Sequence, residues 1–251
     1  VILWFCLTPV AGLAGSSNSL MDISADGKLL ACSNRDSGTV TIVDLAQQEV
    51  LREISVGEKP EGVTFLGATH SLAIAVYDED KVVLLDGDSG KPQAEIDVFD
   101  EPYGVVSSGD GTRIYVTLDF PGQLLEIDTA RAEVVRVLTV GPFLRGAALF
   151  PDEKRLLVTE FYTARVHAID IAGWKKVDQW DGAITDNLCR QIIIHPNRPK
   201  AYLPHIRSKV TGKHGLGSIF PYVAIVDTAA GEGKRRKRIP MDSFLNNLVT
   251  A

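Results

Sequence analysis

Five short stretches recur along the chain and decide its fold: TIVD at 41–44, VLLD at 83–86, LEID at 125–128, HAID at 167–170 and AIVD at 224–227. In each stretch an apolar run leads into an aspartate, and a turn-like sequence follows. The first four aspartates are equally spaced, and the interval to the fifth is longer. A period of about 40 residues built from short strands and turns is typical of a β-propeller, in which each repeat forms one blade.

The third repeat shows the order of elements within one blade. Four apolar strands are predicted at 104–107, 113–118, 123–128 and 133–140, separated by turns rich in Gly, Asp and Pro. The sequence therefore predicts an all-β protein of four-stranded blades. Five blades and the start of a sixth are visible, and we expect them to be truncated from a ring of about six to eight blades. The expected blade limits are 19–60, 61–102, 103–144, 145–187 and 188–241, with a partial blade at 242–251.

The segment 1–14 differs from the repeats. It is an apolar run, VILWFCLTPVAGLA, that ends in small residues and is interpreted as the remnant of a secretory signal peptide. The alternative is a buried first strand. The run is too short and too interrupted by proline to span a membrane. We therefore expect the propeller to occupy 15–251 of an exported protein that is periplasmic, secreted or held at the cell surface.

Composition limits the partners and cofactors of the chain. The formal net charge of −6 over 251 residues disfavours nucleic acid as a partner. The basic run at 234–238 fits a solvated edge strand, where Lys and Arg oppose aggregation. The three cysteines, Cys6, Cys32 and Cys189, follow no disulfide, zinc or C-x-x-C-H haem pattern. We expect Cys32 and Cys189 to be small buried hydrophobic residues.

Two sets of phased residues have structural explanations. An Asp at a strand end can accept hydrogen bonds from the N–H groups of the following turn, so the five phased aspartates are interpreted as turn residues. Gly62, Gly104 and Gly146 repeat with the same spacing as the aspartates, and each belongs to a predicted first strand. Because first strands crowd around the central channel of a propeller, a side chain at these positions is expected to clash.

The fifth repeat breaks the period. Twelve additional residues lie within 204–221, between its second and third predicted strands, and they are predicted to form a loop. This segment carries the basic residues His205, Arg207, Lys209, Lys213 and His214 and no acidic residue. A basic loop on an acidic protein can hold an anion or dock an acidic partner, and the alternative is a solvated loop. His195, His205 and His214 match no compact metal-ligand spacing, so no metal site is expected.

Three phased copies resemble the YVTN-type repeats of bacterial secreted and surface propellers. They read SADGKLLACSNRDSGTVTIVDL at 24–45, SGDGTRIYVTLDFPGQLLEID at 108–128 and PDEKRLLVTEFYTARVHAID at 151–170. The Tyr-Val-Thr core of the repeat stands at 115–117, with the variant Leu-Val-Thr at 157–159. The resemblance covers about residues 20–241. It implies the propeller fold but no single function, since such proteins include surface-layer-like, lactonase-like and cytochrome-attached propellers.

A more particular resemblance lies near the end of the chain. The stretch 200–227, followed by RRKRIPMDSF at 235–244, is similar to a subgroup in which the propeller precedes a c-type cytochrome or a di-haem peroxidase-like domain. That resemblance implies haem in a downstream domain of such a parent protein. No cofactor is expected in this segment, because it contains no C-x-x-C-H motif.

The blade register predicts which side chains meet at one mouth of the central channel. The loop before the first strand and the loop between the second and third strands open on the same face of each antiparallel blade. The first kind of loop supplies Glu61, Tyr103, Arg145 and Arg190, and the second supplies Arg35, Tyr77, Asp119, Phe161 and His205. This mixture suits a polar or anionic ligand or a partner domain. The alternative is that these are the ordinary polar loops of any propeller.

Two functional hypotheses follow. In the first, the chain is a non-catalytic exported module that binds an anionic ligand or a partner through the channel mouth and the basic insertion, as the front part of a c-type cytochrome or peroxidase-like redox protein. In the second, it is a propeller enzyme, either a lactonase-like hydrolase or a dehydrogenase, that uses Arg145, Arg190 and His205. The sequence contains no G-x-S-x-G motif and no phased Ser/His/Asp set, so no catalytic residue is assigned.

Overall fold

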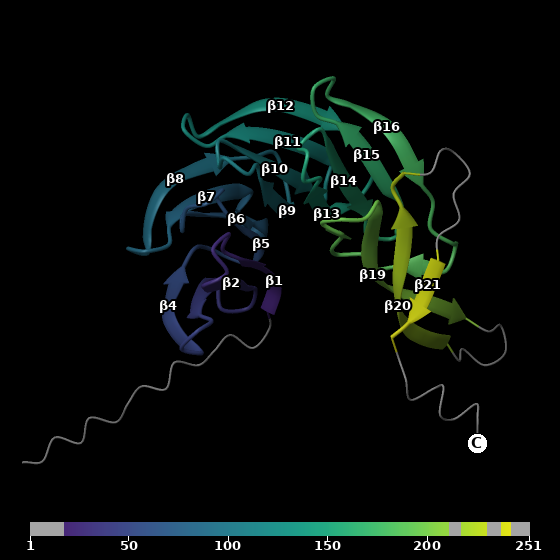
Figure 1. Ribbon diagram of the computed structural model, residues 1–251, viewed down its shortest axis with the longest axis horizontal. Coiled ribbons are helices and arrows are strands. Elements are labelled where there is room, and N and C mark those ends of the chain that lie inside the picture. Colours follow the sequence, from purple (N-terminus) through teal and green to yellow (C-terminus); the bar gives the residue numbers. More distant parts are fainter. Residues whose placement is uncertain (1–17, 211–216, 230–236, 242–251) are drawn as a thin grey trace, which may run out of the picture.

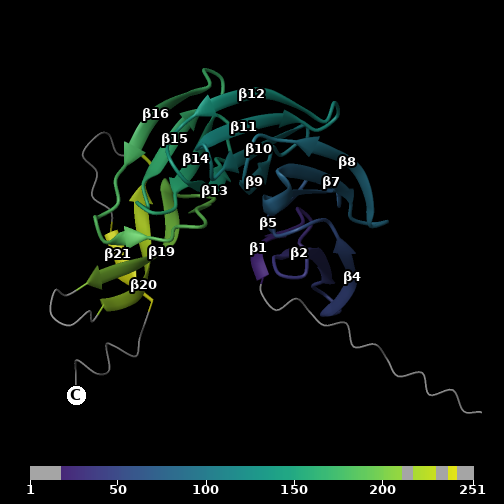
Figure 2. The ribbon, with the colours of Figure 1, turned by 180° about the vertical axis from the view of Figure 1, so that it is seen from behind.

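The computed structural model describes residues 18–210, 217–229 and 237–241, whose strands form five antiparallel sheets. Figure 1 shows these sheets as five blades along an arc, with the first and last blades at its two ends, and Figure 2 shows the same arc from behind. The predicted all-β propeller of four-stranded blades is thereby confirmed. The predicted signal remnant at 1–14 and the predicted partial blade at 242–251 lie outside the described residues.

The first three blades each contain four consecutive strands, ordered from the inside of the arc to its rim (Figure 1). Blade 1 contains β1 (Asn18–Ile23), β2 (Leu29–Asn34), β3 (Thr39–Asp44) and β4 (Glu49–Ser55). Blade 2 contains β5 (Pro60–Phe65), β6 (Leu72–Val76), the short 3-10 helix η1 (Tyr77–Glu79), β7 (Lys81–Asp86) and β8 (Lys91–Asp97). Blade 3 contains β9 (Pro102–Ser107), β10 (Arg113–Leu118), β11 (Gln123–Asp128) and β12 (Glu133–Thr139).

Blade 4 repeats the four-strand pattern, with β13 (Leu144–Leu149), β14 (Arg155–Glu160), β15 (Val166–Asp170) and β16 (Lys175–Trp180).

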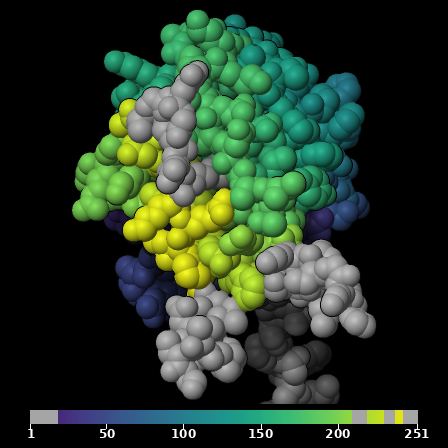
Figure 3. Space-filling view, turned by 90° about the vertical axis from the view of Figure 1, so that its right-hand side faces the viewer, coloured from purple at the N-terminus to yellow at the C-terminus, as the bar shows by residue number. Residues whose placement is uncertain are grey.

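Blade 5 departs from this pattern at its innermost strand. Blade 5 contains β17 (Asp186–Asn187), β18 (Ile193–Ile194), β19 (Lys200–Val210), β20 (Gly217–Asp227) and β21 (Lys237–Pro240). Both β17 and β18 pair with β19, so they are two short pieces of one inner strand. Figure 3 shows this blade from its end of the arc, with β20 and β21 in yellow.

Apolar cores lie between neighbouring blades. Side chains alternate across β6, so Ile74 packs in the core shared with blade 1 and Ala73 packs in the core shared with blade 3. Every residue of β6 is therefore buried, which explains why the second strand of the repeat reads as a continuous apolar run. Cys32 and Cys189 are buried as predicted, and Cys189 belongs to the core between blades 4 and 5.

The phased aspartates and glycines have the structural roles that the sequence predicts. Asp44 Oδ1 accepts the N–H of Ala46 at 2.8 Å, and the other four aspartates accept N–H groups of their own turns in the same way. A Cβ atom added to Gly104 would lie 2.0 Å from the carbonyl oxygen of Arg145 in the next blade. The inner strands therefore approach too closely for any side chain at this position.

The described part of the insertion in blade 5 is a long hairpin. Strands β19 and β20 pair without interruption from Lys200 and Asp227 to Val210 and Gly217. This differs from the loop predicted within 204–221, because the additional described residues extend both strands of the hairpin. Pairing also satisfies the backbone N–H and C=O groups of both arms.

Candidate binding site at the channel mouth

A β-bulge near the start of the innermost strand aims one side chain at the channel mouth in each of the first four blades. The bulges fall at 19–20 in β1, 61–62 in β5, 103–104 in β9 and 145–146 in β13. A bulge redirects a side chain out of the regular ladder. Here the redirected residues include Glu61, Tyr103 and Arg145, and each one meets a loop of the preceding blade.

A hydroxyl group on the second strand completes the hydrogen bonding at these bulges. Thr117 Oγ1 accepts the N–H of Gly104 at 2.9 Å and donates to the carbonyl oxygen of Arg145, in the next blade, at 2.7 Å. Ser33 and Thr159 occupy the same repeat position and accept the N–H of the bulge in their own blades. This role was missed in the sequence, although positions 33, 117 and 159 occupy the same phase of the repeat.

Side chains from the two kinds of mouth loop meet across the blade boundaries. Arg35 Nε lies 2.7 Å from Glu61 Oε1 at the boundary between blades 1 and 2. The ring of Tyr77 packs edge-on against the ring of Tyr103 at the next boundary, with the centroids 6.2 Å apart. The structure thus brings these predicted site residues together in pairs.

Arg145 is the centre of the network on blades 3 and 4. Its Nε and Nη2 donate to Asp119 Oδ2 at 3.0 and 2.6 Å, and the hydroxyl of Tyr77 donates to the same oxygen at 3.2 Å. Its guanidinium carbon lies 4.5 Å from the centroid of Tyr103 and 3.6 Å from that of Phe161. Burial alone would lower the pKa of Arg145, but the hydrogen bonds and charge of Asp119 raise it, so the group stays charged.

Two buried polar atoms at the mouth make no hydrogen bond within the described part of the chain. They are the hydroxyl oxygen of Tyr103, whose side chain is 1% exposed, and Oδ1 of Asp119. Burial raises the pKa of Tyr103, and the charge of Glu61 raises it further, against smaller opposing effects of Arg190, Arg145 and the neighbouring Ser19 hydroxyl, so this hydroxyl is a neutral donor. A buried polar group without a partner costs about 1–3 kcal/mol, so the mouth contains one donor and one acceptor whose hydrogen-bonding capacity is unmet.

Arg190 supplies an exposed positive charge at the mouth. It lines a cavity of about 240 Å³ that is formed by the innermost strands of all five blades. It lies close enough to Tyr103 for its charge to oppose the rise in the pKa of that hydroxyl. Among residues 18–210, 217–229 and 237–241, no carboxylate forms an ion pair with it.

His205 does not join the mouth network. The pairing of β19 with β20 places it at the repeat position of Glu160, one residue before that of Phe161. A shift of one residue turns a strand side chain to the opposite face. His205 is accordingly buried, and its Nε2 lies 3.7 Å from Oδ1 of Asp186, whose Oδ2 is paired with Arg238 at 2.8 Å.

The other basic residues of the insertion are only partly described. Arg207 lies in β19, and its Nε donates to Thr185 Oγ1 at 3.2 Å. The backbone of Lys209 belongs to β19, but its side chain, Lys213 and His214 lie outside the described residues. Their predicted role in binding therefore stays a prediction.

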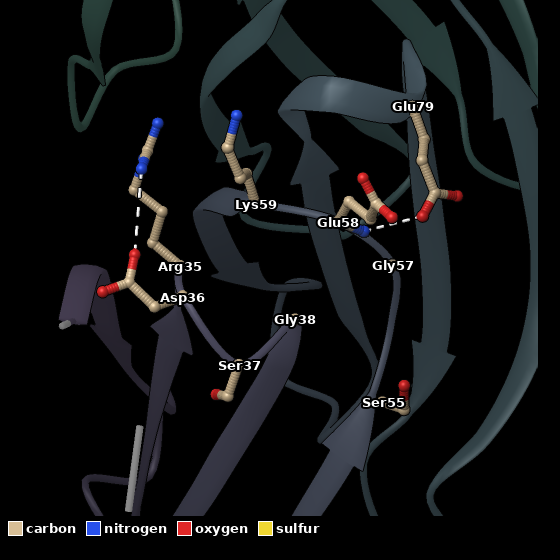
Figure 4. Close-up of a pocket in the computed structure, with 9 residues that line it drawn as sticks. All are labelled: Arg35, Asp36, Ser37, Gly38, Ser55, Gly57, Glu58, Lys59 and Glu79. Atoms are coloured by element: carbon tan, nitrogen blue, oxygen red, sulfur yellow. Dashed lines mark hydrogen bonds and ion pairs between the residues drawn. The ribbon is translucent and has the colours of Figure 1, made fainter. Parts of the chain in front are cut away.

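A larger recess of about 480 Å³ lies beside the mouth, between the loops of blades 1 and 2 (Figure 4). Its charged lining includes Arg35, Glu58, Lys59 and Glu79. Figure 4 shows Arg35 and Lys59 directed to the same side, while Glu58 donates its backbone N–H to Glu79 Oε1 at 2.6 Å. The hydrogen bond from Lys81 lowers the pKa of Glu79 most, and the one from the Glu58 N–H lowers it further, so the recess carries an ionised carboxylate.

Two kinds of feature are absent from the residues that the structure describes. They contain no group of three or more His, Cys, Asp or Glu side chains placed to hold a metal ion. No helix among them has the length and apolar character needed to cross a membrane.

The chain shares its fold with solved propellers. No protein-family model matches it, and no curated protein matches it, so the YVTN type stays a prediction. It is similar to hydrazine synthase from Kuenenia stuttgartiensis, with a TM-score of 0.77, 25% identity and 88% of this chain covered. It is also similar in fold to a chain of a mitotic checkpoint complex, with a TM-score of 0.68, 14% identity and 89% covered. The chain spans 65% and 66% of those two chains, just under two thirds of their length.

Proposed function

We propose that this chain is a binding module whose channel mouth holds a small anionic ligand. The observation that supports this proposal most directly is the exposed Arg190 at the end of the channel. It lies close to the buried hydroxyl of Tyr103, whose hydrogen-bonding capacity is unmet among the described residues. A carboxylate or phosphate oxygen between these two groups would accept a charge-assisted hydrogen bond from one and a neutral one from the other. The propeller neighbours are consistent with a binding or scaffold role, since one of them belongs to a multi-protein complex.

Two finer proposals rest on the repeat resemblance and on the apolar segment 1–14. We propose that the module is exported, and that it serves as the front part of a larger redox protein. Export is tested by fusing the complete N-terminal region of the gene to a reporter that is active only outside the cytoplasm. A reporter that stays inactive, while a fusion with an established signal is active, would contradict export.

The hypothesis of an enzyme site receives no support from the arrangement of its three residues. Arg145 is bound to Asp119, and His205 is turned toward Asp186 in blade 5. Arg190 alone of the three offers an exposed charge to a ligand. We therefore propose binding rather than catalysis for the mouth.

Calorimetric titration of the purified chain with inorganic phosphate and with succinate tests the proposal. Arg190→Ala should weaken binding of the responsive anion by about 10- to 100-fold, which corresponds to loss of a charged hydrogen bond worth about 1.5–3 kcal/mol. Tyr103→Phe should weaken it by a smaller factor. The matched control is Arg198→Ala, because Arg198 is exposed at the opposite end of blade 5, between β18 and β19. Absence of binding to both anions, or equal binding by Arg190→Ala, would contradict the proposal.

A further inference from the structure

The loops on the mouth face differ sharply between the two halves of the arc. They occupy equivalent repeat positions, so their composition can be compared directly. Loops 35–38, 56–59, 77–80 and 98–101, on blades 1 and 2, carry seven acidic residues and two basic ones. Loops 119–122, 140–143 and 161–164, on blades 3 and 4, carry one acidic residue, no basic residue and four aromatic ones. The loops of blades 1 and 2 also carry two aromatic residues, Tyr77 and the 69% exposed Phe99. The mouth face is therefore strongly acidic on one half, whereas the other half has more aromatic residues and a single acidic one.

Three of the aromatic side chains are exposed and lie on adjoining loops. Phe120 is 53% exposed, Phe143 is 42% exposed and Tyr162 is 55% exposed. The rings of Phe143 and Tyr162 pack edge-on with their centroids 4.9 Å apart. The loop of Phe120 is joined to that of Phe143 by the hydrogen bond from Val140 N–H to the carbonyl oxygen of Gly122, at 3.0 Å. We call Phe120, Phe143 and Tyr162 the aromatic patch.

The fold does not require aromatic side chains at these positions. The positions of Phe120 and Tyr162 are occupied by Asp36 in blade 1 and Asp78 in blade 2. The position of Phe143 is occupied by Lys59 and Glu101 at the two preceding blade boundaries, and all three have a positive φ. Since charged residues satisfy the same backbone, the exposed rings have another role, and exposed apolar clusters mark interaction sites.

A recess beside the patch is shaped to accept a side chain. It has a volume of about 330 Å³ and is lined by Tyr162, Arg165, Asp181 and Ile184, among others. Ile184 is fully exposed at its edge, so the recess combines an apolar rim with polar groups. Anchors of protein–protein interfaces are commonly apolar side chains that fill such recesses.

We propose that the mouth face docks a protein partner whose surface places an apolar side chain next to basic residues. This docking surface is separate from the proposed anion site at Arg190 and goes beyond it. The apolar side chain enters the recess beside Tyr162 and covers the aromatic patch. The basic residues face the acidic loops of blades 1 and 2, where the recess of Figure 4 holds Glu58 and Glu79. Complementary charge favours such a partner, and the same carboxylates repel an acidic one or an anionic lipid surface.

Fluorescence anisotropy with short labelled peptides of equal length tests this inference on the full chain. The first peptide alternates Leu and Trp with Lys, the second replaces Lys by Glu, and the third replaces Leu and Trp by Ser. The first should bind at least tenfold more tightly than the other two. Phe143→Ser combined with Tyr162→Ser should weaken it at least tenfold, and Asp36→Asn combined with Asp78→Asn should weaken it several-fold and reduce its dependence on salt.

The controls separate this inference from the proposed anion site. Val50→Ser removes a 64% exposed apolar side chain from the outer strand β4 and should leave peptide binding unchanged. If the double aromatic variant does not fold, Phe120→Ser alone serves, with an expected loss of several-fold. Equal binding of the Lys and Glu peptides, unchanged binding by the aromatic variants, or preference for phosphatidylserine vesicles over the first peptide would overturn the inference. The same variants are also titrated with phosphate, which they should bind as the natural chain does. Arg190→Ala should do the reverse, weakening phosphate binding and keeping peptide binding, so that failure of one site can be told from failure of the other.

Discussion

Replacing Thr117 by valine removes one hydroxyl group from a blade boundary and keeps nearly the same side-chain shape. The hydroxyl is fully buried, accepts the N–H of Gly104 at 2.9 Å and donates to the carbonyl oxygen of Arg145 at 2.7 Å. Each hydrogen bond contributes about 1 kcal/mol net, and a buried donor left unsatisfied costs about 1–3 kcal/mol. We therefore expect Thr117→Val to lower the free energy of unfolding by about 2–4 kcal/mol.

Guanidinium unfolding followed by circular dichroism measures this change. The midpoint should fall while the slope with denaturant stays the same, because the surface exposed on unfolding is unchanged. Tm should fall by about 5–15 °C, since about 1 kcal/mol shifts a domain of this size by about 2–4 °C. Thr117→Ser keeps the hydroxyl and loses one methyl group, so it should stay within about 1 kcal/mol of the natural chain. If Thr117→Val unfolds at the same denaturant midpoint as the natural chain, the idea that this hydroxyl joins two blades is refuted.

Three further predictions concern buried contacts between blades or within one. Gly104→Ala should cost about 3 kcal/mol, because its Cβ would lie 2.0 Å from the Arg145 carbonyl oxygen; a loss below about 1 kcal/mol by chemical denaturation would contradict the close approach. Asp119→Ala should cost about 3–5 kcal/mol because it leaves the largely buried Arg145 unpaired, and adding Arg145→Met should recover part of that loss in a double-mutant cycle. Burial raises the pKa of Glu160, but the hydrogen bonds with His167 and Thr163 and the nearby charges together outweigh it and lower that pKa below its usual 4.5. A lowered pKa stabilises the fold above pH 4.5 and loses that contribution at lower pH, so Tm of the natural chain should fall more steeply than that of Glu160→Gln between pH 5 and pH 3; parallel curves would refute this.

The channel mouth was predictable in part because antiparallel blades place two kinds of loop on one face. Phase alone pointed to Glu61, Tyr103 and Arg145 in the first kind and to Arg35, Tyr77 and Asp119 in the second. The contacts of these residues depend on the β-bulges. In the sequence, the glycine beside each bulged residue is the one sign of a bulge. Whether the mouth binds a ligand is still a prediction.

His205 shows where the reasoning from phase failed. The insertion made its register uncertain by one residue, and one residue is enough to turn a strand side chain from the mouth to the buried face. The acidic and aromatic halves of the mouth face were also overlooked. Their residues are far apart in sequence, and only the arc of blades places loops 35–38, 77–80, 119–122 and 161–164 on one surface.

The sequence by itself determined the blades, because local rules govern them: a turn needs its Asp, a crowded inner strand needs its Gly, and a strand buried on both faces needs a continuous apolar run. Those requirements recur in every repeat and can be read without knowing the partners of any residue. Only the tertiary structure decided that the Thr117 hydroxyl joins two blades and that Arg190 stays unpaired among the described residues. These properties depend on distances between side chains of different blades, and no local sequence pattern specifies those distances.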